Sequence, residues 1–179
     1  MLATGVRPKL PDGVSADQGV HLLRTLTDAR RLADAIRTAR SAVVLGGGLL
    51  GYEIAASARN HRPDVTLADR RTAPLVRPLG SMAGPMVAQL HRERGVRLRL
   101  GAALREVRRT GPTAGHEVVL DDGSCLTSDL VVAAVGSTPN VGWLAGSGID
   151  VEDGVLCDSA GRATPGVRRR RRRPVELRR

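Results

Sequence analysis

A glycine-rich turn between an apolar strand and a helix constrains the fold of this chain more than any other feature. Residues 42–45 form a short, wholly apolar run of strand type, and six turn residues follow it directly: Gly46, Gly47, Gly48, Leu49, Leu50 and Gly51. Positions 51, 54, 55 and 58 then carry small or apolar residues at the i, i+3, i+4, i+7 spacing of one buried helix face. A second strand at residues 65–68 ends on Asp69. Together these segments predict a βαβ unit.

The glycines of this turn have different predicted tasks. Gly46 permits a sharp exit from the strand, Gly48 lets backbone N–H groups approach a pyrophosphate, and Gly51 lets the helix pack closely on the strands. The helix N-terminus carries partial positive charge and unpaired N–H donors, so it would face the phosphates. The alternative is a tight connection in an α/β domain that binds nothing.

The acid at the end of the second strand points to the cofactor. Asp69 lies 23 positions after Gly46, where a carboxylate can accept hydrogen bonds from both hydroxyls of an adenosine ribose. A 2′-phosphate would meet like charge there, so the sequence favours NADH over NADPH. Arg70 and Arg71 leave the other choice open, because either guanidinium could receive a 2′-phosphate.

The rest of the chain predicts an α/β fold, in which a parallel Rossmann-type sheet is flanked by helices and by an antiparallel hairpin layer. Thr27 is the expected N-cap of a helix at residues 28–40, and Gly95 is the expected stop of a helix at 86–94, with Met86, Val87 and Leu90 at helical spacing. The dipeptide Asp122-Gly123 is a strong hairpin signal. Further strands are expected at residues 96–100, 103–109, 117–120, 130–135 and 154–157, and a short helix containing Trp143 from Pro139.

The positive charge of the chain is concentrated at its end. The sequence has 28 Lys+Arg against 18 Asp+Glu, a formal net charge of +10. Residues 168–179 hold eight arginines and a single acid, Glu176, so seven of the ten net charges lie there. Binding to nucleic acid or to other polyanions is therefore predicted for this tail alone, and not for the body of the chain.

Several functional classes find little support in the sequence. Cys125 and Cys157 form no CxxC pair, and the four histidines are scattered, so neither a redox dithiol nor a metal site is expected. The only aromatic residues are Tyr52 and Trp143, too few for a base-stacking platform. Neither a signal peptide nor an apolar run of membrane-spanning length is visible, so we expect a cytoplasmic protein that does not enter the membrane.

Residues 43–56, VVLGGGLLGYEIAA, closely resemble the nicotinamide-binding part of the pyridine nucleotide-disulphide oxidoreductase superfamily, above all its ferredoxin-reductase and rubredoxin-reductase branch. The resemblance covers residues 2–167 and includes Ala3-Thr4-Gly5, Leu120-Asp121-Asp122-Gly123 and Ala134-Val135-Gly136. It implies hydride transfer from NADH to FAD, and then transfer of single electrons to a ferredoxin or rubredoxin.

The resemblance also implies roles for individual residues. Glu53 matches a glutamate beside the nicotinamide ring, although an ordinary helical salt bridge would explain it equally well. Arg77 matches an arginine near the adenine end, with a solvated loop residue as the alternative. Gly136 matches a glycine whose backbone borders the dinucleotide, and a tight turn would also account for it. Asp69 matches the ribose-binding acid.

The resemblance divides the chain into four parts. Residues 1–40 would be a remnant of a flavin-domain strand and a linker helix, 41–136 the NAD(P)-binding domain, 137–167 a partial return to the flavin domain, and 168–179 an arginine-rich disordered tail. The FAD-binding motifs of the family are missing from the sequence, so we expect a fragment that is inactive alone. Two alternatives stay open: a non-catalytic binding module whose tail contacts nucleic acid or acidic surfaces, and a stand-alone dehydrogenase. The second is disfavoured because Lys9 is the only lysine.

Overall fold

The computed structural model describes residues 2–61, 63–111 and 115–163. The chain forms two compact units. The larger unit is Pro8–Ser137, and the smaller combines Met1–Arg7 with Thr138–Arg179. Residues 8–40, which the sequence placed with the flavin-domain remnant, therefore lie in the same unit as the glycine turn.

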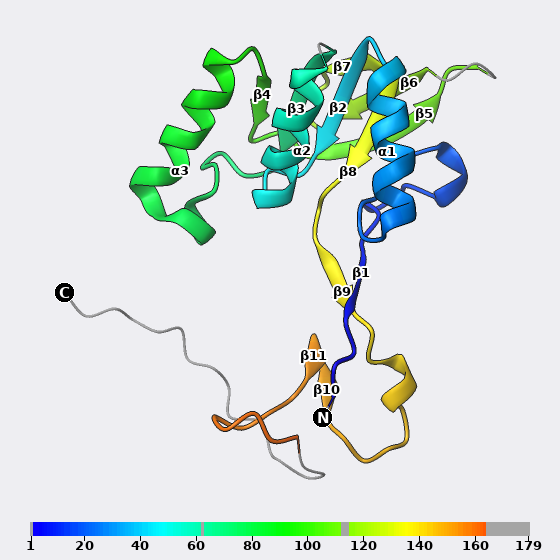
Figure 1. The fold of residues 1–179 in the computed structure, drawn as a ribbon, viewed down its shortest axis with the longest axis vertical. Coiled ribbons are helices and arrows are strands. Elements are labelled where there is room, and N and C mark those ends of the chain that lie inside the picture. Colours follow the sequence, from blue (N-terminus) through cyan, green and yellow to red (C-terminus); the bar gives the residue numbers. More distant parts are fainter. Residues whose placement is uncertain (1, 62, 112–114, 164–179) are drawn as a thin grey trace. The chain divides into compact units, whose positions relative to one another are not determined.

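A four-stranded parallel sheet is the centre of the larger unit (Figure 1), with strand order β4-β3-β2-β8. Its strands are β2 (Ser41–Leu45), β3 (Asp64–Asp69), β4 (Arg97–Leu100) and β8 (Leu130–Ala133). Every residue of β2 from Ala42 to Leu45 is paired in parallel with both β3 and β8. Central strands with two covered faces need apolar residues throughout, which explains the unbroken apolar run that predicted β2.

An antiparallel sheet of three strands forms a second layer, with order β5-β6-β7. It consists of β5 (Leu104–Arg109), β6 (His116–Leu120) and β7 (Cys125–Ser128). The predicted Asp122-Gly123 hairpin joins β6 to β7, and Gly123 has the positive φ of 82° that such a turn requires. Parallel sheet, helices and hairpin layer confirm the predicted α/β fold.

Three α-helices and a 3-10 turn complete the larger unit: α1 (Leu26–Thr38), α2 (Leu49–Asn60), α3 (Val76–Glu93) and η1 (Ala16–Gln18). The predicted N-cap of α1, Thr27, is wrong, because the helix begins two residues earlier. Thr25 is the cap: its side chain accepts from the Asp28 N–H at 3.1 Å, and the Asp28 carboxylate accepts from the Thr25 N–H at 2.8 Å. This reciprocal pair is a capping box.

Helix α3 differs more from its prediction. It begins ten residues before the expected start and has a kink at Gly80, where φ is 79°. Of the three apolar positions that predicted this helix, Met86 is 70% exposed and Leu90 44%, whereas Val87 is partly buried against the core. The buried residues are Gly84 and Ala88. A Cβ at position 84 would lie 2.3 Å from the Pro74 carbonyl oxygen, so close backbone approach selects small residues on this face.

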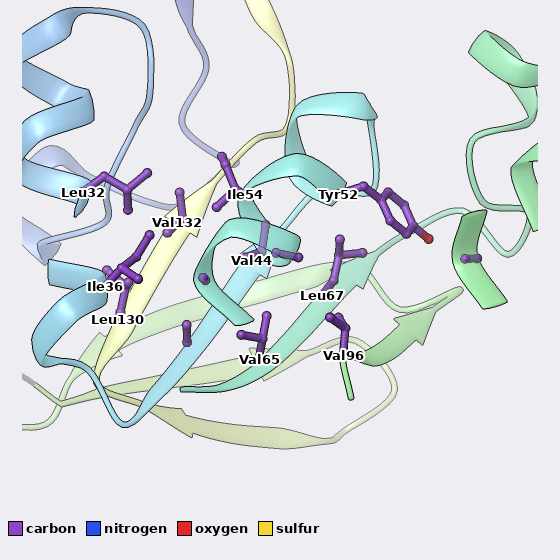
Figure 2. Close-up of a cluster of buried hydrophobic side chains, with 14 of the residues drawn as sticks. Leu32, Ile36, Val44, Tyr52, Ile54, Val65, Leu67, Val96, Leu130 and Val132 are labelled. Carbon is purple, nitrogen blue, oxygen red and sulfur yellow. The ribbon is translucent and has the colours of Figure 1, made fainter. Parts of the chain in front are cut away.

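Alternate residues of the parallel strands belong to two different cores. Val44, Val65, Leu67 and Val132 pack with side chains of α1 and α2, among them Leu32, Ile36 and Ile54, as Figure 2 shows. Val43, Leu45 and Val131 pack on the other face against Val107, Val118 and Leu120 of the hairpin layer. The period of two along each strand assigns the side chains to these faces, and the rigid sheet holds the carboxyl ends of its strands in place.

The remaining elements of the described chain are short: β1 (Val6–Pro8) pairs with β9 (Ser137–Pro139), and β10 (Val151–Glu152) pairs with β11 (Gly154–Val155). The predicted helix after Pro139 is a single 3-10 turn, η2 (Gly142–Leu144), with Trp143 64% exposed. The predicted strand at 154–157 is limited to the two residues of β11. The arginine-rich tail lies outside the described residues. Within the described ranges, no helix combines the length and the hydropathy that a membrane crossing requires.

Candidate dinucleotide-binding site

The carboxyl ends of β2, β3 and β8 meet at one edge of the sheet, where the glycine turn begins. The Gly46 N–H donates to the Ala68 carbonyl oxygen at 2.8 Å, and the Ala134 N–H donates to the Leu45 carbonyl oxygen at 2.7 Å. These bonds hold the turn, the end of β3 and residue 134 together. In open parallel sheets, ligands bind at this edge, outside the carboxyl ends of the strands.

Two glycines of the turn are required by the packing of the chain itself. Gly46 has a φ of 106°, and a Cβ there would lie 2.5 Å from the Ala134 carbonyl oxygen. A Cβ at Gly51 would lie 1.9 Å from the Gly46 carbonyl oxygen, because α2 begins directly against the turn. The sharp exit and close helix packing predicted for these residues are present in the structure.

Gly48 is different, because the packing of the described residues does not require it to lack a side chain. Its φ of −81° is allowed for any residue, and an added Cβ would meet no described heavy atom within 4 Å. Gly48 is the N-cap of α2, and within the described part of the chain no side chain caps this helix. The first N–H groups of a helix have no intrahelical acceptor. Open space therefore adjoins uncapped N–H donors.

Asp69, the last residue of β3, is 6% exposed and lies against the turn. Its Oδ2 accepts from the Gly47 N–H at 2.8 Å and from Arg71 Nη2 at 3.1 Å. Its Oδ1 accepts from the backbone N–H of Arg71 at 3.0 Å and from Arg71 Nε at 3.3 Å. A Cβ at Gly47 would lie 2.5 Å from Oδ2, so this glycine admits the carboxylate. The sequence indicated Asp69 but not its pairing with Gly47 and Arg71.

A basic pocket of about 370 Å³ lies immediately after Asp69. It is lined by Arg70, Arg71, Thr72, Ala73, Val76 and Arg77. Arg70 and Arg77 are exposed, and neither has a hydrogen bond or ion pair within the described ranges. The structure thus places the predicted residues Arg70 and Arg77 on one pocket beside the acid.

The two remaining predicted residues lie on other elements. Glu53 is exposed on the second turn of α2 and has no ion pair among the described residues, so the helical salt bridge that was its alternative is not found. Gly136 is exposed after β8, with a φ of 115°, and its carbonyl oxygen accepts from the Lys9 N–H at 2.9 Å. A Cβ on Gly46 would lie 3.1 Å from the Val135 nitrogen, so the segment that leads to Gly136 borders the glycine turn.

Residue Tyr52, next to Glu53, was not indicated by the sequence. Its ring packs edge-on against His91, with centroids 4.8 Å apart, and its hydroxyl is buried without a hydrogen-bond partner in the described part of the chain. Burial raises the pKa of this hydroxyl. The ring fills the space between α2 and α3 and supports the helix that carries the turn.

The described residues offer little support for a metal site or for a reactive cysteine. Within residues 2–61, 63–111 and 115–163, no three His, Cys, Asp or Glu side chains gather as metal ligands. Cys125 and Cys157 are both exposed and unpaired. Glu117 accepts a hydrogen bond from the Cys125 thiol and raises its pKa, which disfavours the reactive thiolate.

This chain is similar in sequence and in structure to known reductases. Rhodocoxin reductase of Rhodococcus erythropolis is 34% identical over 160 residues, which cover 88% of this chain and 37% of that protein. The ferredoxin–NAD(+) reductase component of the anthranilate 1,2-dioxygenase system of Burkholderia cepacia is 35% identical, with 89% and 39% covered. A ferredoxin reductase from Rhodopseudomonas palustris has a similar structure, with a TM-score of 0.84, 30% identity, and 91% and 40% covered.

Two solved structures of one oxidase illustrate cofactor choice. A water-forming NADH oxidase of Lactobacillus brevis is bound to NADH, and an engineered form of it is bound to NADPH. The five substitutions of that form include one aspartate to alanine and two changes to arginine. Each is 25% identical to this chain, with a TM-score of 0.74, and 83% of this chain and 32% of the oxidase are covered.

The similarity covers less than half of each of these relatives. This chain spans 37% to 41% of the length of the curated relatives that it matches. The family model described as pyridine nucleotide-disulphide oxidoreductase matches residues 1–167. The resemblance inferred from residues 43–56 is confirmed, and the chain belongs to the pyridine nucleotide-disulphide oxidoreductase family.

Proposed function

We propose that the larger unit binds NADH, as part of an FAD-dependent reductase that passes electrons to a ferredoxin or rubredoxin. The observation that carries this proposal is the open start of α2, where Gly48 leaves room beside uncapped N–H groups and Asp69 lies across the turn. Relatives named as ferredoxin–NAD(+) reductases support the class of cofactor and of acceptor.

The pyrophosphate of NADH is proposed to lie on the N-terminus of α2. The backbone N–H groups of Leu49, Leu50 and Gly51 would donate to its oxygens, and the helix dipole favours negative charge there. A side chain at position 48 would occupy the same space, which accounts for a glycine that the protein's own packing does not need. The exposed side chains of Leu49 and Leu50 leave this approach to the backbone open.

Asp69 and Arg77 are proposed to hold the adenosine end. A carboxylate at the end of β3 accepts from ribose hydroxyls and repels a 2′-phosphate, so we propose that NADH is preferred over NADPH. The oxidase pair supports this logic, since its engineered NADPH-bound form lacks an aspartate and gains arginines. The exposed Arg77 lines the pocket beside Asp69, where its guanidinium would contact the adenosine end of the dinucleotide.

Glu53 and Gly136 are proposed to border the nicotinamide end, on the strength of the family resemblance. When bound, NADH supplies the hydride. Within the described residues, the turn at Gly46 to Gly51 is the one strand–glycine–helix turn of this type, and we assign it to NADH rather than to FAD. We assign no flavin-binding residues within the described ranges, and we propose that the pure protein is colourless and does not oxidise NADH at a useful rate.

Titration calorimetry of the chain with NADH tests the proposal. We expect saturable binding that Gly48→Val weakens strongly, with an unchanged circular dichroism spectrum. Absence of binding, or binding that Gly48→Val leaves unaltered, would refute the assignment. The alternative of polyanion binding through residues 168–179 concerns residues outside the described ranges and stays a prediction, as does a cytoplasmic location.

A further inference from the structure

The carboxylate that would select NADH is fully engaged by the protein itself. An ionised carboxylate offers about four acceptor positions. Asp69 uses its two oxygens to accept four hydrogen bonds, one from the Gly47 N–H and three from Arg71. Its side chain is 5% exposed, whereas that of Arg71 is 47% exposed. A ribose that donates to Asp69 must therefore first displace the Arg71 guanidinium.

A 2′-phosphate makes the opposite demand. A phosphate accepts hydrogen bonds and carries negative charge, so it needs donors and cations. Arginine has five side-chain N–H bonds, and Arg71 donates two of them to Asp69, which leaves three for another acceptor. The ion pair also offsets the carboxylate charge that would otherwise repel the phosphate.

We propose that Arg71 is a specificity-determining residue. It reduces the difference in affinity between NADH and NADPH, so that this site also binds NADPH. In the free protein, its guanidinium occupies the acceptors that a ribose diol needs. With NADPH, the same guanidinium stays on Asp69 and faces the 2′-phosphate, in the pocket that Arg70 and Arg77 also line. This inference rests on the proposed NADH function of the glycine turn.

Arg70 provides the matched comparison. It lines the same pocket and carries the same charge, but it makes no hydrogen bond to Asp69. Loss of Arg70 removes a cation from the pocket without releasing the carboxylate. Arg30, exposed on α1 and without a described ion pair, controls for the loss of one positive charge outside this pocket.

The experiment measures dissociation constants of NADH and NADPH by calorimetry at one salt concentration, for the unaltered chain and three variants. Arg71→Ala should tighten NADH binding about threefold, because a partly exposed ion pair no longer competes. The same change should weaken NADPH binding by about tenfold or more, because a charged hydrogen-bond partner is lost. Arg70→Ala should weaken NADPH without tightening NADH, and Arg30→Ala should leave the ratio of the two constants unaltered.

The outcomes separate this inference from the proposed function. If the unaltered chain binds neither dinucleotide, the proposed function fails and the inference fails with it. If NADH binds, but Arg71→Ala leaves the ratio of the two dissociation constants unchanged, Arg71 has no role in specificity and the proposed function stands. If Arg71→Ala and Arg70→Ala shift the ratio equally by weakening NADPH alone, the shift reflects pocket charge, and occupation of Asp69 by Arg71 is refuted.

Discussion

Replacement of Gly46 by alanine should destabilise the larger unit, whereas replacement of Gly48 should not. An alanine at position 46 would hold a φ of 106°, which costs about 1–3 kcal/mol in strain. Its Cβ would also lie 2.5 Å from the Ala134 carbonyl oxygen, and relief of such overpacking costs about 1–3 kcal/mol more. We therefore expect the free energy of unfolding to fall by about 2–6 kcal/mol for Gly46→Ala.

Gly48→Ala is the matched control, with the same added methyl group in the same turn. Its φ of −81° is ordinary and no described atom lies within 4 Å of the new Cβ, so we expect a loss below about 1 kcal/mol, from the weaker N-cap. Urea unfolding followed by far-ultraviolet circular dichroism would measure both. With a slope of about 2 kcal/mol per M, Gly46→Ala should lower the midpoint by about 1 M or more. Equal midpoints for the two variants would refute the packing argument.

Three further predictions concern Asp69 as the proposed ribose-binding residue, the N-terminal cap of α1, and the arginine-rich tail. Asp69→Ala should weaken NADH by about 1.5–3 kcal/mol through loss of a charged hydrogen-bond acceptor, measured by calorimetry, and an unchanged affinity would contradict the role of Asp69. The Thr25 N–H and hydroxyl lower the pKa of Asp28 from its ordinary 3.8, so stability that is present above this pH should be lost as pH falls through the lowered value. Asp28→Asn should reduce this acid dependence in urea unfolding between about pH 5 and pH 2; an unaltered profile would argue against the capping box. A chain that ends at Val167 should lose salt-sensitive binding to nucleic acid and keep its affinity for NADH, and nucleic-acid binding that survives at moderate salt would exclude the tail as its source.

The βαβ unit was predictable because its signals are local. An apolar run, a glycine turn, a helical spacing and a second apolar run follow one another in the sequence. The structure has β2, α2 and β3 at the predicted places. The N-cap of α1 was missed by two residues because Thr25 and Thr27 are both residues that favour the N-cap position. The signal that could have found it is the Thr25-x-x-Asp28 spacing of a capping box.

Other features depend on contacts between distant segments. The buried face of α3 is set by small residues that approach the loop at Pro74, and hydrophobic periodicity favoured Met86 and Leu90 instead. The pairing of Asp69 with Arg71 depends on a side-chain conformation that no spacing specifies. The sequence indicated the candidate residues, whereas the hydrogen-bond acceptors of Asp69 that are already occupied became apparent only in three dimensions.

Backbone amide chemical shifts, measured by NMR as NADH is added, would test most directly where the dinucleotide binds. The account predicts the largest shifts for the N–H groups of Gly47 to Gly51 at the start of α2, followed by those of Arg70 and Arg71 after β3. Residues of the hairpin layer, β5 to β7, should change little, because they pack against the other face of the parallel sheet. Saturable shifts that are largest in β5 to β7, with the glycine turn unperturbed, would contradict the account.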